Sequence, residues 1–280
     1  MSPDVDPFTV DSDGVILSGE QSGQGPAVVL LHGLTATRRY VVMGSRLLQR
    51  SGIRVVAYDA RAHGASAPAP DPGSYDYATL AGDLEAVLDA LGLERAILAG
   101  ASMGAHTALT FALAHPGRVA ALALITPAYD PAAPAGGHDL EHWDALAAGL
   151  RERGVEGFIE ASDLHSLPAA WRETVEKVIR QRLGAHEHPL AVADALQAVP
   201  RSHPFERLDQ LAALAVPALV VGSRDEADPG HPLAVAELYA RVLPQAQLAV
   251  EREGSPIAWQ GGRLSRLLLE LAERATAEDG

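Results

Sequence analysis

A serine framed by glycines, between an apolar run and a helical pattern, constrains the fold of this chain more than any other feature. The apolar residues 96–99 lead into Gly100-Ala101-Ser102-Met103-Gly104, and a helical pattern follows over residues 106–114. Small residues two positions before and two positions after Ser102 allow a tight, strained turn that presents the serine hydroxyl above a sheet. The amide groups at the start of the following helix favour negative charge at the same place. Ser102 is therefore a candidate nucleophile at the end of a strand.

The remaining apolar runs predict an α/β fold with a mostly parallel sheet. Runs rich in Val, Ile, Leu and Ala recur at intervals that leave room for a helix between them, as in a sheet covered on both faces. Helical stripes over residues 77–91 and 264–272 provide two of the covering helices. Residues 8–19, with Asp13-Gly14 in the middle, predict an antiparallel hairpin at the sheet edge. The expected strands are residues 27–31, 54–57, 96–98, 120–125, 217–221 and 247–250.

The regular alternation of strand and helix stops after Pro127. Residues 130–204 contain helical segments and no convincing strand pattern. We therefore predict an inserted helical cap at 130–204, between a first part of the core at 1–129 and a second part at 205–280. Its aromatic and aliphatic residues favour an apolar pocket.

A second motif makes the chain resemble the α/β-hydrolase family. Residues 28–34 read as a buried strand that ends in His32-Gly33. In that family the residue after this pair donates one backbone N–H to the oxyanion hole, which here implies Leu34. The N–H of Met103, directly after the serine, is the second implied donor. We expect His32 to brace the loop, and His32 and Gly33 to border the pocket.

Two further motifs extend the resemblance over nearly the whole chain. Residues 58–66 are similar to the family's D-x-R-G-x-G-x-S turn, with Ala62 in place of the usual glycine, and the resemblance implies an architectural role. Residues 220–225 read as a buried strand followed by a G-x-x-D turn, where the family keeps its catalytic carboxylate. The resemblance therefore implies Asp225 as the acid. Asp228, just beyond it, is expected either to cap a helix or to border the pocket.

The family's usual catalytic histidine is missing from this chain. A serine hydroxyl needs a base within hydrogen-bond reach, and in the family that base follows the last strand. Ser255 occupies the corresponding segment, so it is expected only to border the pocket, and the sequence has no histidine after His231. The triad is incomplete by this criterion.

Three interpretations follow from the missing histidine. In the first, a histidine from another loop acts as the base in a hydrolase that uses Ser102 on small to medium apolar esters, thioesters or amides. His231 is the leading candidate, although a position before Pro232 also suits a surface or capping residue. In the second, the fold supports a non-hydrolytic reaction, such as a cyclisation, an elimination or C–C bond chemistry. In the third, the chain binds a ligand without catalysis.

Composition narrows the classes of partner. Lys and Arg total 22 against 36 Asp and Glu, and the net charge of −14 disfavours nucleic acid and anionic membranes, which leaves a small-molecule substrate or ligand. The chain lacks cysteine, a recognisable signal segment and a membrane-spanning apolar run, which fits the cytoplasm. Nucleotide-binding glycine patterns are missing, and no cofactor or metal is expected. The oligomeric state is left open.

Overall fold

The computed structural model describes residues 5–133, 137–224 and 228–278, and within them the chain forms one eight-stranded sheet. The strand order is β1-β2-β4-β3-β5-β6-β7-β8, and the pairs from β4 to β8 are all parallel. The predicted α/β fold with a mostly parallel sheet is confirmed. The strands are β1 (Val5–Ser12), β2 (Val15–Ser22), β3 (Ala27–Leu31), β4 (Arg54–Tyr58), β5 (Ala96–Ala101), β6 (Val119–Ile125), β7 (Ala218–Val221) and β8 (Ala246–Ala249).

An antiparallel hairpin of β1 and β2 begins the sheet, as the sequence predicts. Asp13 and Gly14 connect the two strands, and both have positive φ angles, of 50° and 83°. Such a pair matches the twist of a two-residue hairpin. The β2 strand then pairs antiparallel with β4, which joins the hairpin to the parallel part of the sheet.

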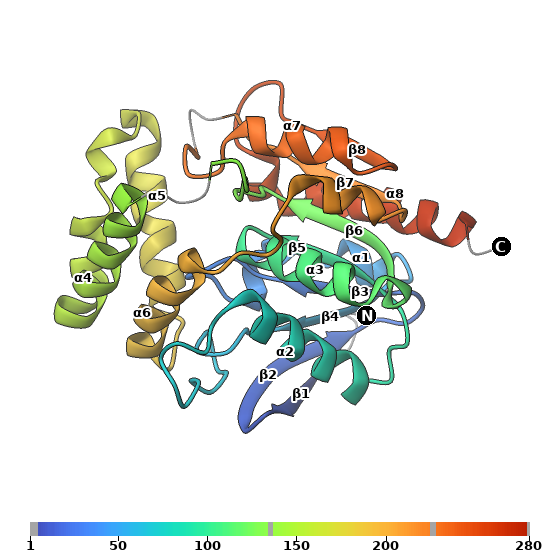
Figure 1. The fold of residues 1–280 in the computed structure, drawn as a ribbon, viewed down its shortest axis with the longest axis horizontal. Helices are drawn as coiled ribbons and strands as arrows, with labels where there is room; N and C mark the ends of the chain where they lie inside the picture. Colours follow the sequence, from blue (N-terminus) through green and yellow to red (C-terminus); the bar gives the residue numbers. More distant parts are fainter. Residues whose placement is uncertain (1–4, 134–136, 225–227, 279–280) are drawn as a thin grey trace.

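Helices cover both faces of the sheet (Figure 1). The α2 (Tyr77–Ala90), α3 (Met103–Ala114) and α7 (Leu233–Val242) helices pack their apolar side chains into one buried cluster. The short α1 (Leu47–Arg50) and the C-terminal α8 (Gly261–Glu278) contribute to the cluster on the opposite face. The strands therefore bury both faces, which explains their continuous apolar runs.

A separate group of helices lies between β6 and β7 in the sequence, on one side of the sheet (Figure 1). These helices are α4 (Gly137–Ala161), α5 (Ala169–Leu183) and α6 (Pro189–Ala198). They share a small apolar core that includes Leu150, Phe158 and Leu196. The α4 helix is broken at Gly154, whose φ is 63°. This group occupies the stretch in which the sequence shows helical segments.

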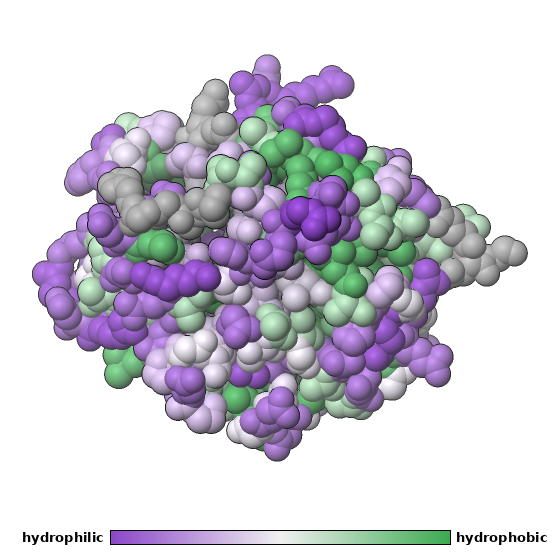
Figure 2. Space-filling view, in the orientation of Figure 1, coloured by the Kyte–Doolittle hydropathy of each residue, from purple (hydrophilic) through white to green (hydrophobic). Residues whose placement is uncertain are grey.

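The molecular surface in this view is mainly hydrophilic, while hydrophobic side chains gather over α7 and β8 (Figure 2). Leu248, on the edge strand β8, is one of the exposed large hydrophobic residues of the described chain. No helix in the described part of the chain is long and apolar enough to cross a membrane.

Candidate functional site

Ser102 stands at a strained turn between β5 and α3. Its φ and ψ angles are 50° and −113°, a backbone conformation that residues other than glycine rarely adopt. The Ser102 N–H donates to the carbonyl of Ile125 at 2.9 Å. The two flanking glycines are required by close backbone contacts. A Cβ on Gly104 would lie 2.2 Å from the Leu31 oxygen, and one on Gly100 would lie 2.1 Å from the Gly104 oxygen. The predicted serine turn is therefore present, and its strain lies at the residue expected to react.

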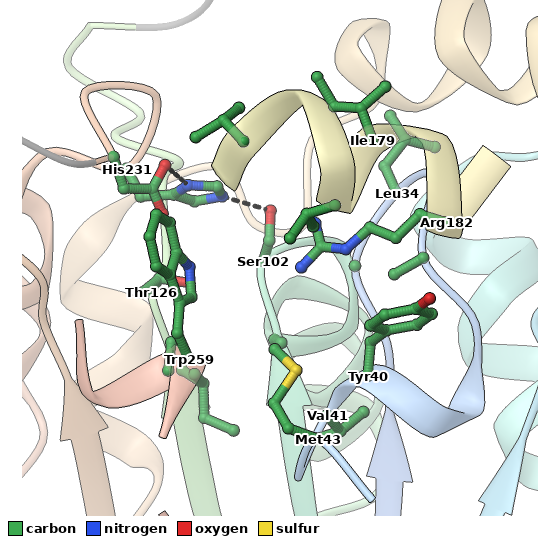
Figure 3. A pocket seen from close by; sticks show the side chains of 18 of the residues that line it. Leu34, Tyr40, Val41, Met43, Ser102, Thr126, Ile179, Arg182, His231 and Trp259 are labelled. Carbon is green, nitrogen blue, oxygen red and sulfur yellow. Dashed lines mark hydrogen bonds and ion pairs between the residues drawn. The ribbon is translucent and has the colours of Figure 1, made fainter. Parts of the chain in front are cut away.

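His231 reaches the serine hydroxyl. Its Nε2 lies 2.8 Å from Ser102 Oγ, and its Nδ1 lies 2.8 Å from Asp228 Oδ1 (Figure 3). Asp228 and His231 are the first and last residues of an Asp-Pro-Gly-His turn, closed by a 3.1 Å bond from the His231 N–H to the Asp228 carbonyl. One turn therefore places both side chains on the same side of the backbone, facing the serine.

Ser102, His231 and Asp228 form a hydrogen-bonded relay, and its electrostatics suit proton transfer. Burial favours the neutral form of the Asp228 carboxyl, but His231 and Arg182 outweigh it, so the pKa of Asp228 lies below its usual value. An ionised Asp228 accepts a hydrogen bond from Nδ1–H of His231. The Nε2 atom of His231 is then the acceptor for the proton of the Ser102 hydroxyl.

The loop after β3 lies beside Ser102. A Cβ added to Gly33 would lie 3.4 Å from the Ser102 Cβ, and Gly33 and Leu34 both line the cavity at the serine. Thr35 follows with a φ of 67°, and its carbonyl pairs with His186 Nε2 at 3.0 Å. Met103, on the other side, opens α3, where the first amide groups have no partner within the helix. The backbone N–H groups of Leu34 and Met103 are thus placed on two elements that meet at the serine.

His32 is a buried brace and does not line the serine cavity. Its Nδ1 pairs with the Gly33 carbonyl and its Nε2 accepts from the Ala60 N–H, each at 2.9 Å. Burial lowers the pKa of His32 to about 4, so the ring is neutral near pH 7. The expected role as a brace fits these contacts, whereas the expectation that His32 borders the pocket is corrected.

The cavity in front of Ser102 has a volume of about 250 Å³ and is mainly apolar. The α5 helix forms one wall with Thr174, Val175, Val178, Ile179 and Arg182, which share one helix face because their spacing is three or four residues. The opposite walls come from the loops after β3, β6, β7 and β8 (Figure 3). The segment 130–204 thus contributes one side of the site.

The other site residues predicted from the sequence differ in whether they line the cavity. Asp225 lies outside the described residues. Ser255 is exposed on the surface, and the neighbouring Trp259, rather than Ser255, lines the cavity, which corrects that expectation. Gly33 and Asp228 line the cavity as expected. Within the described ranges, no group of three or more His, Cys, Asp or Glu side chains could hold a metal ion.

The turn at residues 58–66 lies behind the site. Arg61 donates to both carboxylate oxygens of Asp83, at 2.7 and 2.6 Å, and this buried pair joins the turn to α2. Ala62 has a φ of 69°, which explains why the family usually has glycine there. His63 is buried and absent from the lining of the serine cavity.

His106, one turn into α3, has its own buried partners. The Tyr77 hydroxyl lies 3.0 Å from its Nδ1, and the N–H groups of Ala128 and Tyr129 approach its Nε2 at 3.3 Å. Burial, followed by the charge of His231, lowers the pKa of His106 to about 3. His106 therefore belongs to the floor beneath the site.

The sequence signal for the relay was the order Asp228-Pro229-Gly230-His231. Proline and glycine at the two central positions favour a tight turn, and a turn brings its first and last residues together. The segment after β8, where the family usually has its catalytic histidine, instead anchors the loop after β7. Glu251 Oε1 accepts from the Ser223 hydroxyl at 3.2 Å and from the Arg224 N–H at 2.7 Å, which holds the start of the loop that leads to His231.

Comparisons with known proteins agree with this geometry. The family model described as alpha/beta hydrolase fold matches residues 26–258. A protein of Variovorax paradoxus (strain S110), named "Putative carbamate hydrolase RutD", is 32% identical over 204 residues, or 72% of this chain and 75% of that protein.

Solved structures of similar proteins cover almost the whole chain. A thermophilic esterase from Thermogutta terrifontis, with malate bound, matches with a TM-score of 0.78 at 26% identity over 96% of this chain and 99% of its own. A hydrolase from Pseudomonas aeruginosa PA01 matches with a TM-score of 0.69 at 28% identity, over 94% and 98% of the two chains. Since the family match extends from β3 to the loop after β8, the chain belongs to the alpha/beta hydrolase fold family.

Proposed function

We propose that the protein is a serine hydrolase with Ser102 as nucleophile, His231 as base and Asp228 as the carboxylate that orients His231. This proposal rests on two distances in the relay, 2.8 Å from Ser102 Oγ to His231 Nε2 and 2.8 Å from His231 Nδ1 to Asp228 Oδ1. The order Ser, Asp, His along the chain is the usual one for this fold. Only the histidine departs from the usual position for this fold, because it follows β7 rather than the last strand, β8.

Each group has a defined step in the proposed reaction. His231 Nε2 takes the hydroxyl proton as Ser102 Oγ attacks the substrate carbonyl carbon, and the imidazolium formed is stabilised by Asp228. The N–H groups of Leu34 and Met103 stabilise the oxyanion. His231 then gives its proton to the leaving group, and the C–O, C–S or C–N bond of the substrate breaks. A water molecule then gives a proton to His231 and attacks the acyl carbon. The bond between the acyl carbon and Ser102 Oγ breaks as His231 returns the proton to Oγ, which releases the acid.

The cavity supports a small or medium substrate with an apolar part. A volume of about 250 Å³ admits an acyl chain of several carbons, and the face of α5 with Val175, Val178 and Ile179 offers apolar contact. We propose an ester, thioester or amide as the substrate class, with α4 to α6 acting as a cap over the site.

The relay favours hydrolysis over the other two interpretations of the sequence. A non-hydrolytic reaction that uses only the oxyanion hole, or a binding protein, does not require an imidazole aligned between a serine and a carboxylate. The pKa of Asp228 below its usual value supports the same assignment, because the base needs an ionised partner near neutral pH.

The test is covalent labelling with a fluorophosphonate, followed by the intact mass. We expect one adduct on the wild type and none on Ser102→Ala or His231→Gln. His142→Gln is the matched control, because His142 is an exposed histidine on α4 outside the lining of the cavity. Labelling of the His231→Gln protein at the wild-type rate would contradict the assignment of the base, and an unlabelled, folded wild type would contradict the hydrolase.

A further inference from the structure

The cavity at Ser102 contains the guanidinium group of Arg182, which makes no hydrogen bond or ion pair with the residues that the structure describes. Arg182 projects from α5 into the cavity (Figure 3). Within the described residues no hydrogen bond or ion pair involves its guanidinium group, and its Nε atom is buried without a hydrogen-bond partner. The described contact of this group is the face of the Tyr40 ring, whose centre lies 5.3 Å from the Arg182 Cζ. Arg182 thus contacts an aromatic ring, while its Nε donor has no hydrogen-bond partner in the described part of the chain.

A partly buried arginine that makes no ion pair with the described residues is costly for the free protein. Burial lowers the pKa of Arg182, against the opposing influence of Asp228 and Tyr40. Asp228 does not satisfy the charge, because its carboxylate is bonded to His231 and lies beyond ion-pair distance of Arg182. A planar guanidinium with free donors matches a carboxylate, which it can bind through two parallel hydrogen bonds. An anionic ligand bound to Arg182 would therefore offset this cost.

The position of Arg182 relative to the relay indicates which part of a substrate it meets. His231 lies on one side of Ser102, while Arg182, Tyr40 and Leu34 lie on the other (Figure 3). The leaving group must lie next to His231, which gives it a proton, and the carbonyl oxygen must lie next to the Leu34 N–H. The acyl chain is then directed away from His231, toward the side of the cavity with Arg182.

We infer that Arg182 forms a carboxylate subsite, and that the protein hydrolyses esters whose acyl part ends in a carboxylate, such as half-esters of dicarboxylic acids. This inference rests on the proposed serine hydrolase function and names the substrate class of that site. The net charge of −14 disfavours anions at long range, so a local cation such as Arg182 is needed to offset that repulsion at the site. The cavity is mainly apolar, and Arg182 adds a site for an anionic end of the substrate.

Equilibrium binding to the Ser102→Ala protein tests the subsite without turnover. The probes are monomethyl adipate, which carries a free carboxylate, and dimethyl adipate, its neutral twin. We expect calorimetry to show about tenfold or greater preference for the monoester. Arg182→Gln in the same background should weaken monoester binding roughly 10- to 100-fold, because a charge-assisted pair is lost, and leave diester binding within about threefold. Retained diester binding shows that the cavity is intact.

Two control variants separate the subsite from general charge effects. Arg180→Gln removes the same charge from the same helix, but Arg180 is exposed and paired with Glu156 and Glu176, so monoester binding should not change. Arg182→Lys keeps the charge without the planar fork and should restore part of the affinity. Equal binding of the two probes, or a preference that survives Arg182→Gln, would overturn the inference.

Turnover by the wild type distinguishes this inference from the proposed function. Hydrolysis of both esters, with the monoester preferred and the preference lost in Arg182→Gln, supports both. If a folded wild type cleaves neither ester and does not react with fluorophosphonate, the hydrolase proposal fails, while the binding comparison still decides the subsite.

Discussion

Asp228 and His231 stand three residues apart on one turn, and their side chains meet at 2.8 Å between Oδ1 and Nδ1. The carboxylate and the imidazole beside Ser102 are therefore positioned by the same four residues. In the usual arrangement of this fold the two groups come from loops after different strands. Here both groups lie on the single loop after β7. The distance between them therefore does not depend on the position of the C-terminal segment.

This arrangement predicts that Asp228, and not Asp225, is the carboxylate that matters for turnover. Asp228→Asn keeps the shape but replaces the acceptor of the His231 Nδ1–H, so the imidazole is held in the wrong tautomer. We expect ester kcat to fall by about 10³- to 10⁴-fold, as for the matching change in serine proteases. Steady-state kinetics on a neutral ester would measure it.

Asp225→Asn is the matched comparison, because Asp225 occupies the position at which the family keeps its acid. We expect kcat within about threefold of the wild type, since the carboxylate bonded to His231 Nδ1 is that of Asp228. A loss at residue 225 as large as the loss at residue 228 would restore the assignment that the family resemblance implies.

The serine turn predicts a steric limit at Gly104. A Cβ there would lie 2.2 Å from the Leu31 oxygen, a backbone atom that cannot move without distorting β3. We expect Gly104→Ala to lower the free energy of unfolding by roughly 2 to 4 kcal/mol, in the range of overpacked or strained sites, and to abolish fluorophosphonate labelling. Chemical denaturation followed by circular dichroism would measure the stability.

Gly82→Ala provides the control for that change. Gly82 lies within α2, and a Cβ there meets nothing within 4 Å. Alanine is the better helix former, so this variant should be more stable by about 0.5 to 1 kcal/mol. Equal effects at the two glycines would contradict the close contact between Gly104 and β3.

Much of the fold could be predicted from the sequence because its signals are local. Apolar runs located all the parallel strands, and Asp13-Gly14 located the hairpin turn. The serine turn was also readable, because its glycines are adjacent in the chain. By contrast, whether His231 reaches Ser102 depends on the path of a loop 129 positions away, which no local pattern fixes.

Arg182 shows the same limit for specificity. Its sequence context, within the polar helix α5, is typical of a solvent-exposed arginine, and nothing nearby marks it as part of a site. It lines the cavity because α5 packs over the loops of the sheet, which is a tertiary property. The histidine near Ser102 is subject to the same limit, since no histidine follows β8 and only the folded loop after β7 brings the His231 ring to 2.8 Å from the Ser102 hydroxyl.

The buried histidines predict a loss of stability in mild acid. In the unfolded chain a histidine gains its proton near pH 6.5, whereas in the folded protein the pKa of His32 is about 4 and that of His106 about 3. Between these values the unfolded state binds more protons, so acid favours unfolding. Each ring should contribute a slope of up to about 1.4 kcal/mol per pH unit below pH 6.5.

Denaturant unfolding at several pH values from 7 to 5 would measure this slope. His106→Gln should reduce it by about one histidine's share, because glutamine does not titrate. Replacement of the exposed His142 should leave the slope unchanged. A wild-type stability that is flat between pH 7 and pH 5 would contradict the burial of neutral rings at these positions.

Glu251 predicts that the segment after β8 still controls the base, although it carries no histidine. Its buried Oε1 accepts from the Ser223 hydroxyl and the Arg224 N–H, at the start of the loop that presents Asp228 and His231. Glu251→Ala leaves these donors without their acceptor, so we expect a loss of about 1 to 3 kcal/mol in stability. Since a small displacement of His231 breaks its contact with Ser102, kcat should fall about 10- to 100-fold.

Glu251→Gln separates positioning from charge, because glutamine keeps an acceptor at the Oε1 position. This variant should recover most of the kcat lost in Glu251→Ala, while KM stays close to that of the wild type. Glu253→Ala, an exposed change in the same segment, should leave both constants unchanged. If Glu251→Gln is as slow as Glu251→Ala, the negative charge itself acts on the relay, and the role of Glu251 is electrostatic rather than positional.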